Sequence, residues 1–316
     1  MEGLKIDIEC YKPQHKELWD CFMDNCRNST FLHKRDYMDY HSDRFNDHSL
    51  LFYCNNELIA AMPGHINEGV FGTHKGLTYG GLLIGNNTTA ALVLEIFNTF
   101  IQHLIDETNV TKIVYRPVPH IYHRYPCEEE LYALFRHNAQ LTERKISSTI
   151  ELERQLPFKG RRKLTATMKS QLKIVEDENF TAFWEILGQR LENKYGVAPV
   201  HSLSEIELLH SRFPENIKLF RVTDREGNTL GGSVLYITNN VVHSQYTGSS
   251  NEGRRIGVLD HLYSYLIKER YRHMRYFDFG ISVEDGGHYL NKGLIGQKEG
   301  FGARAIMYDT YELSIR

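Results

Sequence analysis

The stretch VVHSQYTGSSNEGRRIGVLDHLYSYLI, residues 241–267, decides the fold of this protein. Residues 241–249 predict a β-strand, and the polar loop after them leads into a helix whose apolar residues share one face. The segment RYFDFGIS, residues 275–282, is short and apolar and predicts a further strand. A strand, a helix and a strand in this order form a crossover. We therefore expect two parallel strands that separate at their carboxyl ends, where ligands enter α/β sheets.

The same order of elements occurs twice along the chain. In the second half, a hairpin at 217–239 precedes the stretch quoted above, and a glycine-rich loop, a short helix near 291–300 and a last strand at 303–315 follow it. In the first half, a hairpin at 51–66, a strand at 76–85, a helix at 91–107, a strand at 110–120, a helix at 127–139 and a strand at 143–153 repeat this order. The repeat predicts two domains of one topology, residues 1–155 and 156–316.

Each repeat is preceded by two predicted helices, at 15–26 and 34–45 in the first half and at 180–195 and 202–213 in the second. Between the halves lies a basic segment, which predicts a linker that enters a basic helix. It holds Lys159, Arg161, Arg162, Lys163, Lys169 and Lys173.

The length of 316 residues suits two domains, each large enough to form its own core. With 41% hydrophobic and 24% charged residues, and no apolar run near the roughly 20 residues that a span requires, we expect no membrane span.

The N-terminus MEGLKIDIEC has no secretory pattern, so the expected location is the cytoplasm. Five cysteines, an odd number without a C-x-x-C pair, predict reduced and mostly buried thiols.

Charge is divided unevenly between the halves. Residues 1–158 carry a net charge of −6 and residues 159–316 carry +3, so the second half is the expected host of an anionic ligand. The loop SSNEGRRIG, residues 249–257, offers glycines for close backbone approach, N–H groups at a helix start and two arginines. This combination predicts a phosphate or pyrophosphate site. The alternative is a capped helix with solvated charges.

Polar side chains on the two crossover strands are the candidate catalytic groups. Alternation along the strand predicts that His243, Gln245 and Thr247 share one face, where His243 could act as a general base. A structural, hydrogen-bonded histidine is the alternative. Asp278 lies between two phenylalanines, and a buried carboxylate requires a partner. That partner could be the reaction centre or, alternatively, the nearby loop 285–287.

Other classes of enzyme lack their residues. The sequence contains no G-x-x-x-x-G-K-[ST], no G-x-G-x-x-G after a strand, no G-x-S-x-G and no H-E-x-x-H. The pair His120 and His123 has no cysteine or carboxylate at a matching spacing, and neighbouring prolines place it in a turn. We therefore predict no metal site.

The twice-repeated order resembles the GNAT acyltransferase fold, and its tandem use is similar to the FemAB-type branch. The segments that carry the resemblance are HSQYTGSSNEGRRIGVLDHLYSYLI, RYFDFGIS and LIGQKEGFGAR, with GLTYGGLLIG and RRKLTATMKSQLKIV also similar. The resemblance implies an α/β (α+β) fold of two tandem GNAT-like domains, each a mixed β-sheet with helices on both faces. It also implies that an acyl group passes directly to an amine from a thioester or, in Fem-type enzymes, from an aminoacyl-tRNA ester.

The resemblance places the site in the second domain. The expected catalytic residues are His243, Gln245, Asp278 and Tyr289. The expected donor-binding residues are Thr247, Gly248, Ser249, Ser250, Gly253, Arg254, Arg255, Gly257 and Lys298. The cosubstrate would be acetyl-CoA or another acyl-CoA, with no permanently bound cofactor. The backbone at 245–247 would supply the oxyanion donor.

The chain departs from the family pattern at two places. The acetyl-CoA signature Q/R-x-x-G-x-G/A is kept only as residues 254–259, where Leu259 replaces the second small residue. The position of the tyrosine that often protonates the thiolate is Gly296, so Tyr289, expected at the start of the same helix, is the candidate substitute. Lys298 agrees with the FemAB-type pattern.

Three hypotheses follow. The first is an N-acyltransferase that moves an acyl group from acyl-CoA to a small primary amine such as an amino sugar or cell-envelope precursor. The second is a Fem-type transferase, in which the basic segment 159–173 would contact tRNA. The third is a non-catalytic scaffold, in which large side chains of residues 243–257 would fill the donor groove. The first domain is expected not to bind the donor, because its loop 85–89 has no arginine and only one glycine. Its role would be to complete an acceptor cleft.

Overall fold

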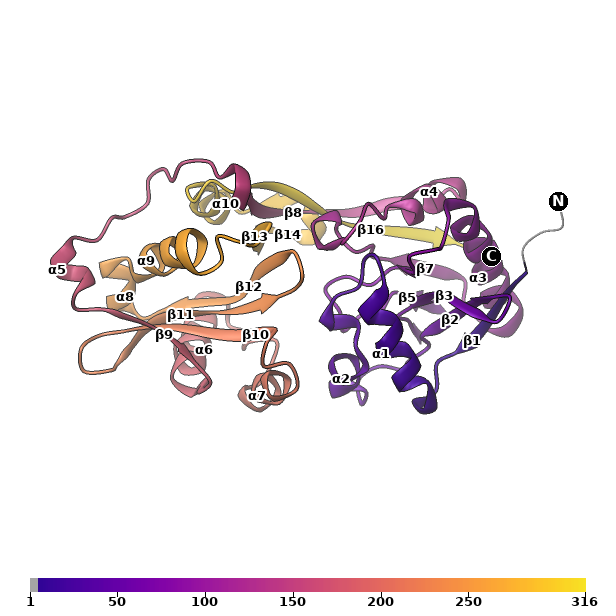
Figure 1. Ribbon diagram of the computed structural model, residues 1–316, viewed down its shortest axis with the longest axis horizontal. Coiled ribbons are helices and arrows are strands. Elements are labelled where there is room, and N and C mark those ends of the chain that lie inside the picture. Colours follow the sequence, from indigo (N-terminus) through magenta and orange to yellow (C-terminus); the bar gives the residue numbers. More distant parts are fainter. Residues whose placement is uncertain (1–4) are drawn as a thin grey trace. The chain divides into compact units, whose positions relative to one another are not determined.

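A computed structural model describes residues 5–316 and divides the chain into two compact units (Figure 1). Unit 1 consists of the residues up to Ile146 together with Val283–Tyr289 and Met307–Arg316. Unit 2 consists of Ser147–Ser282 and Leu290–Ile306.

Unit 1 contains two sets of strands. One is an antiparallel sheet in the order β1 (Ile6–Cys10), β2 (Leu50–Cys54), β3 (Glu57–Met62) and β6 (Leu83–Ile84). The other has the order β4 (His65–Asn67), β5 (Val70–Gly72), β7 (Lys112–Tyr115) and β16 (Arg304–Ser314), in which β5 and β7 are parallel. The helices are α1 (Lys16–Asn25), α2 (Arg35–Met38), α3 (Ala90–Glu107) and α4 (Glu129–Arg136).

The predicted amphipathic helix at 91–107 is α3, whose buried side chains recur at helical spacing. They are Val93, Ile96, Phe97, Phe100 and Leu104. These side chains pack with Phe52 and Phe71 into the core of unit 1. Two other predictions for this unit were wrong. The strand at 76–85 is reduced to β6, because the backbone at Gly81 turns to a φ of +72°. The helix at 34–45 is only α2 followed by a 3-10 turn.

Unit 2 is a six-stranded ladder in the order β8, β13, β12, β11, β10, β9. Its strands are β8 (Gln140–Glu151, of which Ser147–Glu151 lie in this unit), β9 (Lys173–Asp177), β10 (Ile217–Thr223), β11 (Thr229–Ile237), β12 (Val241–Ser249) and β13 (Tyr276–Ile281). Its helices are α5 (Ala166–Lys169), α6 (Thr181–Tyr195), α7 (Leu203–Arg212), α8 (Asn251–Ile256), α9 (Val258–Tyr265, continued as a π-helix over Leu266–Arg270) and α10 (Lys292–Glu299). Two short strands pair with each other, β14 (Val283–Glu284), which belongs to unit 1, and β15 (Tyr289–Leu290), whose Tyr289 belongs to unit 1 and Leu290 to unit 2.

Helices cover both faces of the unit 2 sheet, with α9 on one face and α6 and α7 on the other (Figure 1). The predicted order of three antiparallel strands, helix, parallel strand, helix and strand is confirmed. The predicted basic helix is wrong. After the single turn of α5 the chain is extended, because residues 173–177 pair with β10 as an additional strand.

The last strand of each sequence repeat belongs to the unit formed mainly by the other repeat. Ser147–Glu151 of β8 pair with β13 in unit 2. The end of β16 pairs with β7 in unit 1. Long-range pairing of this kind leaves no periodic signal in the sequence, since the alternation along a strand does not specify which strand it pairs with.

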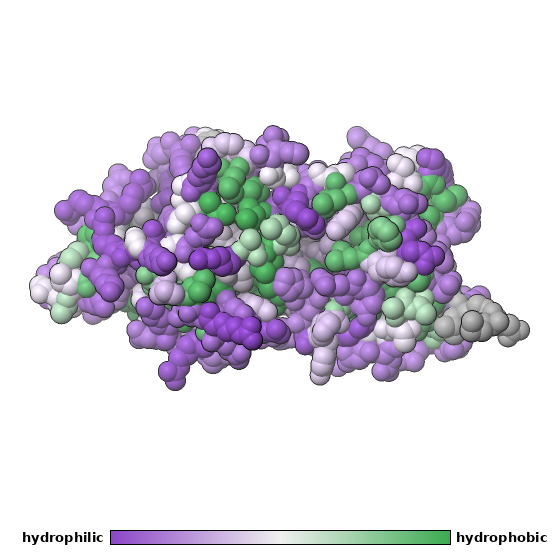
Figure 2. All heavy atoms as spheres, turned by 90° about the horizontal axis from the view of Figure 1, so that it is seen from above, coloured by the Kyte–Doolittle hydropathy of each residue, from purple (hydrophilic) through white to green (hydrophobic). Residues whose placement is uncertain are grey.

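Hydrophilic residues dominate the face of the molecule seen in Figure 2, and hydrophobic residues gather there in separate patches. None of the helices in residues 5–316 combines the length and apolar character needed to cross a membrane. Short 3-10 turns lie at Pro13–His15, Phe31–His33, Asp39–His41, His120–Tyr122, Leu152–Arg154 and Asp285–Gly287.

Candidate active site

The two crossover strands separate as the sequence predicted. β12 and β13 pair in parallel only at Val241–Tyr276, Val242–Phe277 and His243–Asp278. Beyond His243 the pairing ends, while β12 continues to Ser249. On the other side of β12 the register with β11 shifts between Tyr246 and Ser244, so Gln245 is the extra residue of a β-bulge. The bulge and the end of the parallel pairing together open the sheet at this point.

Because of the bulge, Thr247 lies on the other face of β12 from the one that the sequence predicts. A regular strand would place Thr247 beside His243, but the extra residue puts it on the side of Ser244, with the two hydroxyl oxygens 2.9 Å apart. Thr247 and Ser244 both contact the buried hydroxyl of Tyr263 on α9, at 2.5 and 2.7 Å. Burial raises the pKa of Tyr263 despite these hydrogen bonds. No sequence pattern distinguishes Tyr263 from the other core residues of an amphipathic helix, so it was not among the predicted site residues.

His243 and Asp278 form a hydrogen-bonded pair. Nδ1 of His243 lies 2.8 Å from Oδ2 of Asp278, whose side chain is 0% exposed. The other carboxyl oxygen accepts hydrogen bonds from Ser147 at 2.6 Å and Thr149 at 2.8 Å, both on β8. Burial acts to raise the pKa of Asp278, but the hydrogen bonds from His243, Ser147 and Thr149 hold it below its ordinary value. Asp278 thus has partners on β12 and β8.

This arrangement selects one tautomer of His243. An ionised Asp278 only accepts hydrogen bonds, so in the neutral form of the ring Nδ1 carries the proton and Nε2 presents its lone pair. Gly280, at φ +76°, leaves space for the ring, because a Cβ there would lie 3.2 Å from Cε1 of His243. A neutral imidazole held in one tautomer by a buried carboxylate is suited to accept a proton from a substrate.

Lys298 lies close to this pair. Its buried amine donates hydrogen bonds to the backbone carbonyls of Gly280 at 2.8 Å and Ile281 at 2.7 Å. Burial lowers its pKa to about 8, although nearby Asp278 acts to raise it. Lys298 therefore secures the end of β13. Lys298 is a predicted donor-binding residue, but it is not among the residues that line the hollow beside α8.

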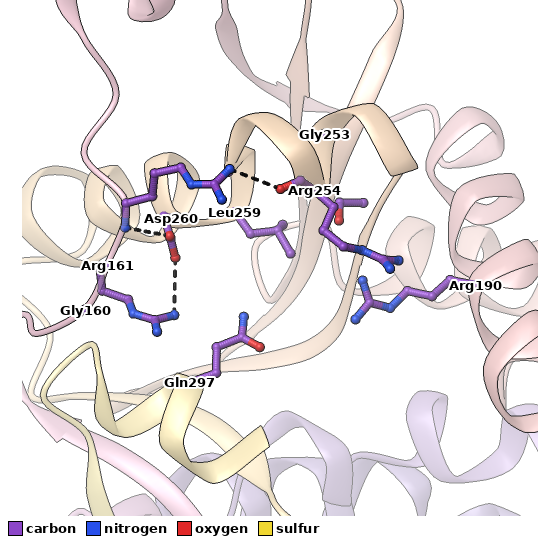
Figure 3. A pocket seen from close by; sticks show the side chains of 11 residues that line it. Gly160, Arg161, Arg190, Gly253, Arg254, Leu259, Asp260 and Gln297 are labelled. Carbon is purple, nitrogen blue, oxygen red and sulfur yellow. Dashed lines mark hydrogen bonds and ion pairs between the residues drawn. The ribbon is translucent and has the colours of Figure 1, made fainter. Parts of the chain in front are cut away.

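A cationic hollow of about 460 Å³ lies beside α8 in unit 2 (Figure 3). Of the predicted donor-binding residues, Ser249, Gly253, Arg254 and Gly257 line it. The remaining lining residues are Gly160, Arg161, Arg162, Arg190, Leu259, Asp260 and Gln297. Figure 3 shows the guanidinium groups of Arg254 and Arg190 approaching each other from different helices, with the Gln297 amide directed into the same space. Four arginines and a single carboxylate favour an anionic ligand.

The single carboxylate of the hollow is already engaged. Asp260 accepts a hydrogen bond from the backbone N–H of Arg162 at 2.8 Å and lies 3.4 Å from the guanidinium of Arg161. The side chain of Arg162 in turn binds the carbonyls of Arg254 and Arg255 near the end of α8. Gly257 allows this contact, because it adopts φ +92° and a Cβ there would lie 2.7 Å from Arg162. The basic segment is thus held against α8 as one wall of the hollow.

Other predicted donor-binding residues have different positions. Ser250 caps α8 by accepting a hydrogen bond from Gly253 N–H at 3.0 Å. Gly248 lies beside Leu187 of α6. The side chain of Arg255 is 79% exposed, pairs with Glu252 at 3.6 Å and does not line the hollow.

Arg190 and Gln297 were not among the predicted site residues, because single polar residues on helices give no distinguishing signal. Tyr289, a predicted acid, is 57% exposed and belongs to β15 and unit 1. The sequence predicts Tyr289 at the start of the short helix near 291–300. This prediction is wrong, since α10 starts at Lys292.

A second hollow of about 740 Å³ shares Arg190, Ser249 and Arg254 with the first. Its other lining residues lie on α6 and at the start of α8. They are Ile186, Gln189, Asn193, Lys194, Ser250 and Asn251. The shared arginines make the two hollows neighbours, so an extended anionic ligand could occupy both.

Comparison with known proteins agrees with this architecture. Residues 158–289 match the family described as "Acetyltransferase (GNAT) domain". Among solved structures, FemX has a TM-score of 0.66 at 11% identity, covering 98% of this chain and 97% of its own. L-PGS from Bacillus licheniformis has a TM-score of 0.57 at 10% identity, covering 96% and 92%. A tandem GNAT protein from the clavulanic acid biosynthesis pathway has a TM-score of 0.51 at 9% identity, covering 99% of both chains.

No curated protein matches the sequence. At such low identities the structural similarity shows the fold alone, and the family match covers most of unit 2. The chain therefore has a tandem GNAT-like fold, similar to the structure of FemX and to that of the tandem GNAT protein, and its residues 158–289 match the acetyltransferase (GNAT) domain family.

Proposed function

We propose that this protein is an N-acyltransferase that transfers an acyl group from acyl-CoA to a primary amine, using the site in unit 2. The observation that carries the proposal is the combination, within one unit, of an arginine-lined hollow with a histidine oriented by a buried carboxylate. The hollow suits the phosphates of the donor, and the histidine suits an amine that must lose a proton. Ser249, Gly253, Arg254 and Gly257 line the hollow and leave it open, which favours this proposal over a non-catalytic scaffold.

The proposed reaction proceeds without a covalent enzyme intermediate. The neutral amine attacks the thioester carbonyl, and Nε2 of His243 takes the proton that the nitrogen loses. The C–N bond forms, the C–S bond breaks, and the thiolate takes the proton from the imidazolium, which restores the neutral ring. Beyond His243, β12 has no partner strand on its β13 side, so backbone N–H groups there are placed to donate to the tetrahedral oxyanion.

The direct test is calorimetric titration of the full chain with acetyl-CoA and longer acyl-CoAs. We expect Arg254→Ala and Arg190→Ala each to weaken donor binding roughly tenfold or more, since a hydrogen bond to a charged group contributes about 1.5–3 kcal/mol. Arg255→Ala is the matched control. Arg255 is the next residue after Arg254, but its side chain points away from the hollow, so this substitution should change donor binding little. Absence of acyl-CoA binding by the unmodified protein, with or without an amine, would contradict the proposal.

The second hollow supports one alternative, a Fem-type transfer from aminoacyl-tRNA. Lys194 and Arg190 extend the positive lining along α6, beyond the hollow beside α8. A nucleic-acid donor would neutralise several such groups, and its affinity would fall steeply with salt. A gel shift with aminoacylated tRNA at low and high salt distinguishes the two donors, and no shift at low salt rejects tRNA.

A further inference from the structure

Three potential metal ligands meet in unit 1, outside the site described above. Cys10 ends β1, His48 precedes β2 and His103 lies on α3. One ligand atom from each lies within 4.8 Å of the other two, and Sγ of Cys10 is 4.0 Å from Nε2 of His48. In the part of the chain that the structure describes, no other three cysteine, histidine or acidic side chains come this close.

The hydrogen bonding of this cluster is incomplete. Nε2 of His103 is buried and has no hydrogen-bond partner among the described residues. The contact between Cys10 and His48 is at the limit for a sulfur hydrogen bond and leaves His103 unsatisfied. A buried polar atom without a partner is rare in folded proteins and requires an explanation. A bound cation would supply one.

The separations suit a tetrahedral ion. Zinc binds sulfur at about 2.3 Å and imidazole nitrogen at about 2.0–2.1 Å, which places neighbouring ligand atoms roughly 3.5 Å apart. The sulfur and nitrogen of Cys10 and His48, 4.0 Å apart, would move together by about half an ångström, and ligand atoms up to 4.8 Å apart would approach by up to about 1.3 Å, which side-chain rotations allow. All three residues are only partly buried, so an ion can reach them from solvent.

We propose that unit 1 binds a divalent transition metal of the zinc class through Cys10, His48 and His103, with water as the fourth ligand. One thiolate and two imidazoles are ligands of intermediate softness, which favour zinc over magnesium or calcium. The ion would join the end of β1 and the approach to β2 to α3. This site is distinct from the arginine-lined hollow, and no sequence pattern predicts it, because the three ligands are far apart along the chain.

The test is titration of the full-length, metal-free protein with Co²⁺, followed by competition with Zn²⁺. We expect one equivalent of Co²⁺ to give a thiolate charge-transfer band with the visible spectrum of tetrahedral cobalt, both removed by Zn²⁺. One proton should be released from the thiol for each ion bound. Cys10→Ser should abolish the charge-transfer band. His48→Ala and His103→Ala should weaken binding by more than the roughly 10–100-fold that loss of an outer-shell partner costs.

Matched controls keep the test specific. Cys21→Ser and His120→Ala change an exposed cysteine and an exposed histidine of the same unit and should leave the spectrum unchanged. Circular dichroism of each variant, together with His103→Gln as a closer replacement, separates loss of the site from loss of the fold. The proposal is overturned if folded protein gives no thiolate band, or if the band persists in Cys10→Ser.

Discussion

Replacing Asp278 with asparagine tests the proposed role of His243 most directly. The amide keeps the volume of the carboxyl group, and its oxygen can still accept from Ser147 and Thr149. Its NH₂ group would then face Nδ1 of His243, in place of the carboxyl oxygen that now lies 2.8 Å away. Since an NH₂ group only donates, the ring must accept at Nδ1 and carry its proton on Nε2. The variant histidine could no longer take a proton from an amine.

The size of the effect follows from the charge that is removed. An imidazolium forms next to Asp278 when His243 takes the proton, and two unit charges about 4 Å apart attract by about 4 kcal/mol at an effective dielectric constant near 20. At 1.36 kcal/mol per power of ten, this corresponds to roughly a thousandfold in rate. We therefore expect kcat to fall by about 10²–10⁴ in Asp278→Asn, with little change in donor affinity.

Two measurements check this prediction. Rates of acyl transfer from the donor that binds in calorimetry, measured with a panel of amines, give the loss in kcat. Nitrogen-15 NMR of the His243 ring reports the tautomer without any substrate and should show protonation moving from Nδ1 to Nε2. The reasoning is refuted if the unmodified protein already carries the proton on Nε2, or if Asp278→Asn keeps both the tautomer and the rate.

Three further predictions concern stability. Glu130 is buried, accepts a hydrogen bond from Leu82 N–H at 2.9 Å and has a pKa raised by burial to about 8. Because its folded pKa lies above the unfolded value near 4.5, the stability it contributes is lost as pH rises from about 4.5 through 8. Urea unfolding at pH 5 and pH 9 should show this loss in the free energy of unfolding, at about 1.36 kcal/mol per unit of pKa difference. Glu130→Gln should remove most of the difference between the two pH values. An equal change in the free energy of unfolding for both proteins would contradict the assignment. Gly253→Ala should destabilise unit 2, since a Cβ there would lie 2.0 Å from the carbonyl oxygen of Leu230, and an unchanged midpoint of thermal unfolding would show that the helix can shift. Gly296→Ala, in the interior of α10 with no atom within 4 Å of the added Cβ, should instead raise stability by about 0.5–1 kcal/mol, and a decrease would argue against the described helix.

Local structure was predictable wherever apolar residues followed a clear period. α3, α9 and the strands β10 to β12 lie where their patterns place them, because burial of one face is encoded by residues that are neighbours in sequence. The predictions failed at 76–85 and 166–177. There the backbone conformation depends on Gly81 and on pairing of β9 with β10, and neither has a periodic signal.

The candidate site was predictable only in part. His243 and Asp278 were identifiable one at a time, as polar residues in otherwise apolar strands. Their pairing depends on the parallel register of β12 and β13. Ser147 and Thr149, which hold the other oxygen of Asp278, come from a strand about 130 residues earlier in the chain. No local pattern connects residues at that separation.

The sequence by itself determined the repeated topology, the positive charge of the second half and the loop that would meet an anion. Tertiary structure decided which side chains face the hollow. Successive residues on a helix point about 100° apart, so Arg254 lines the hollow while Arg255 turns to Glu252. Arg190 and Gln297 join Arg254 from two other helices. Periodicity records how each segment buries its own apolar face, whereas a binding site is made by contacts between segments, and those contacts exist only once the chain has folded.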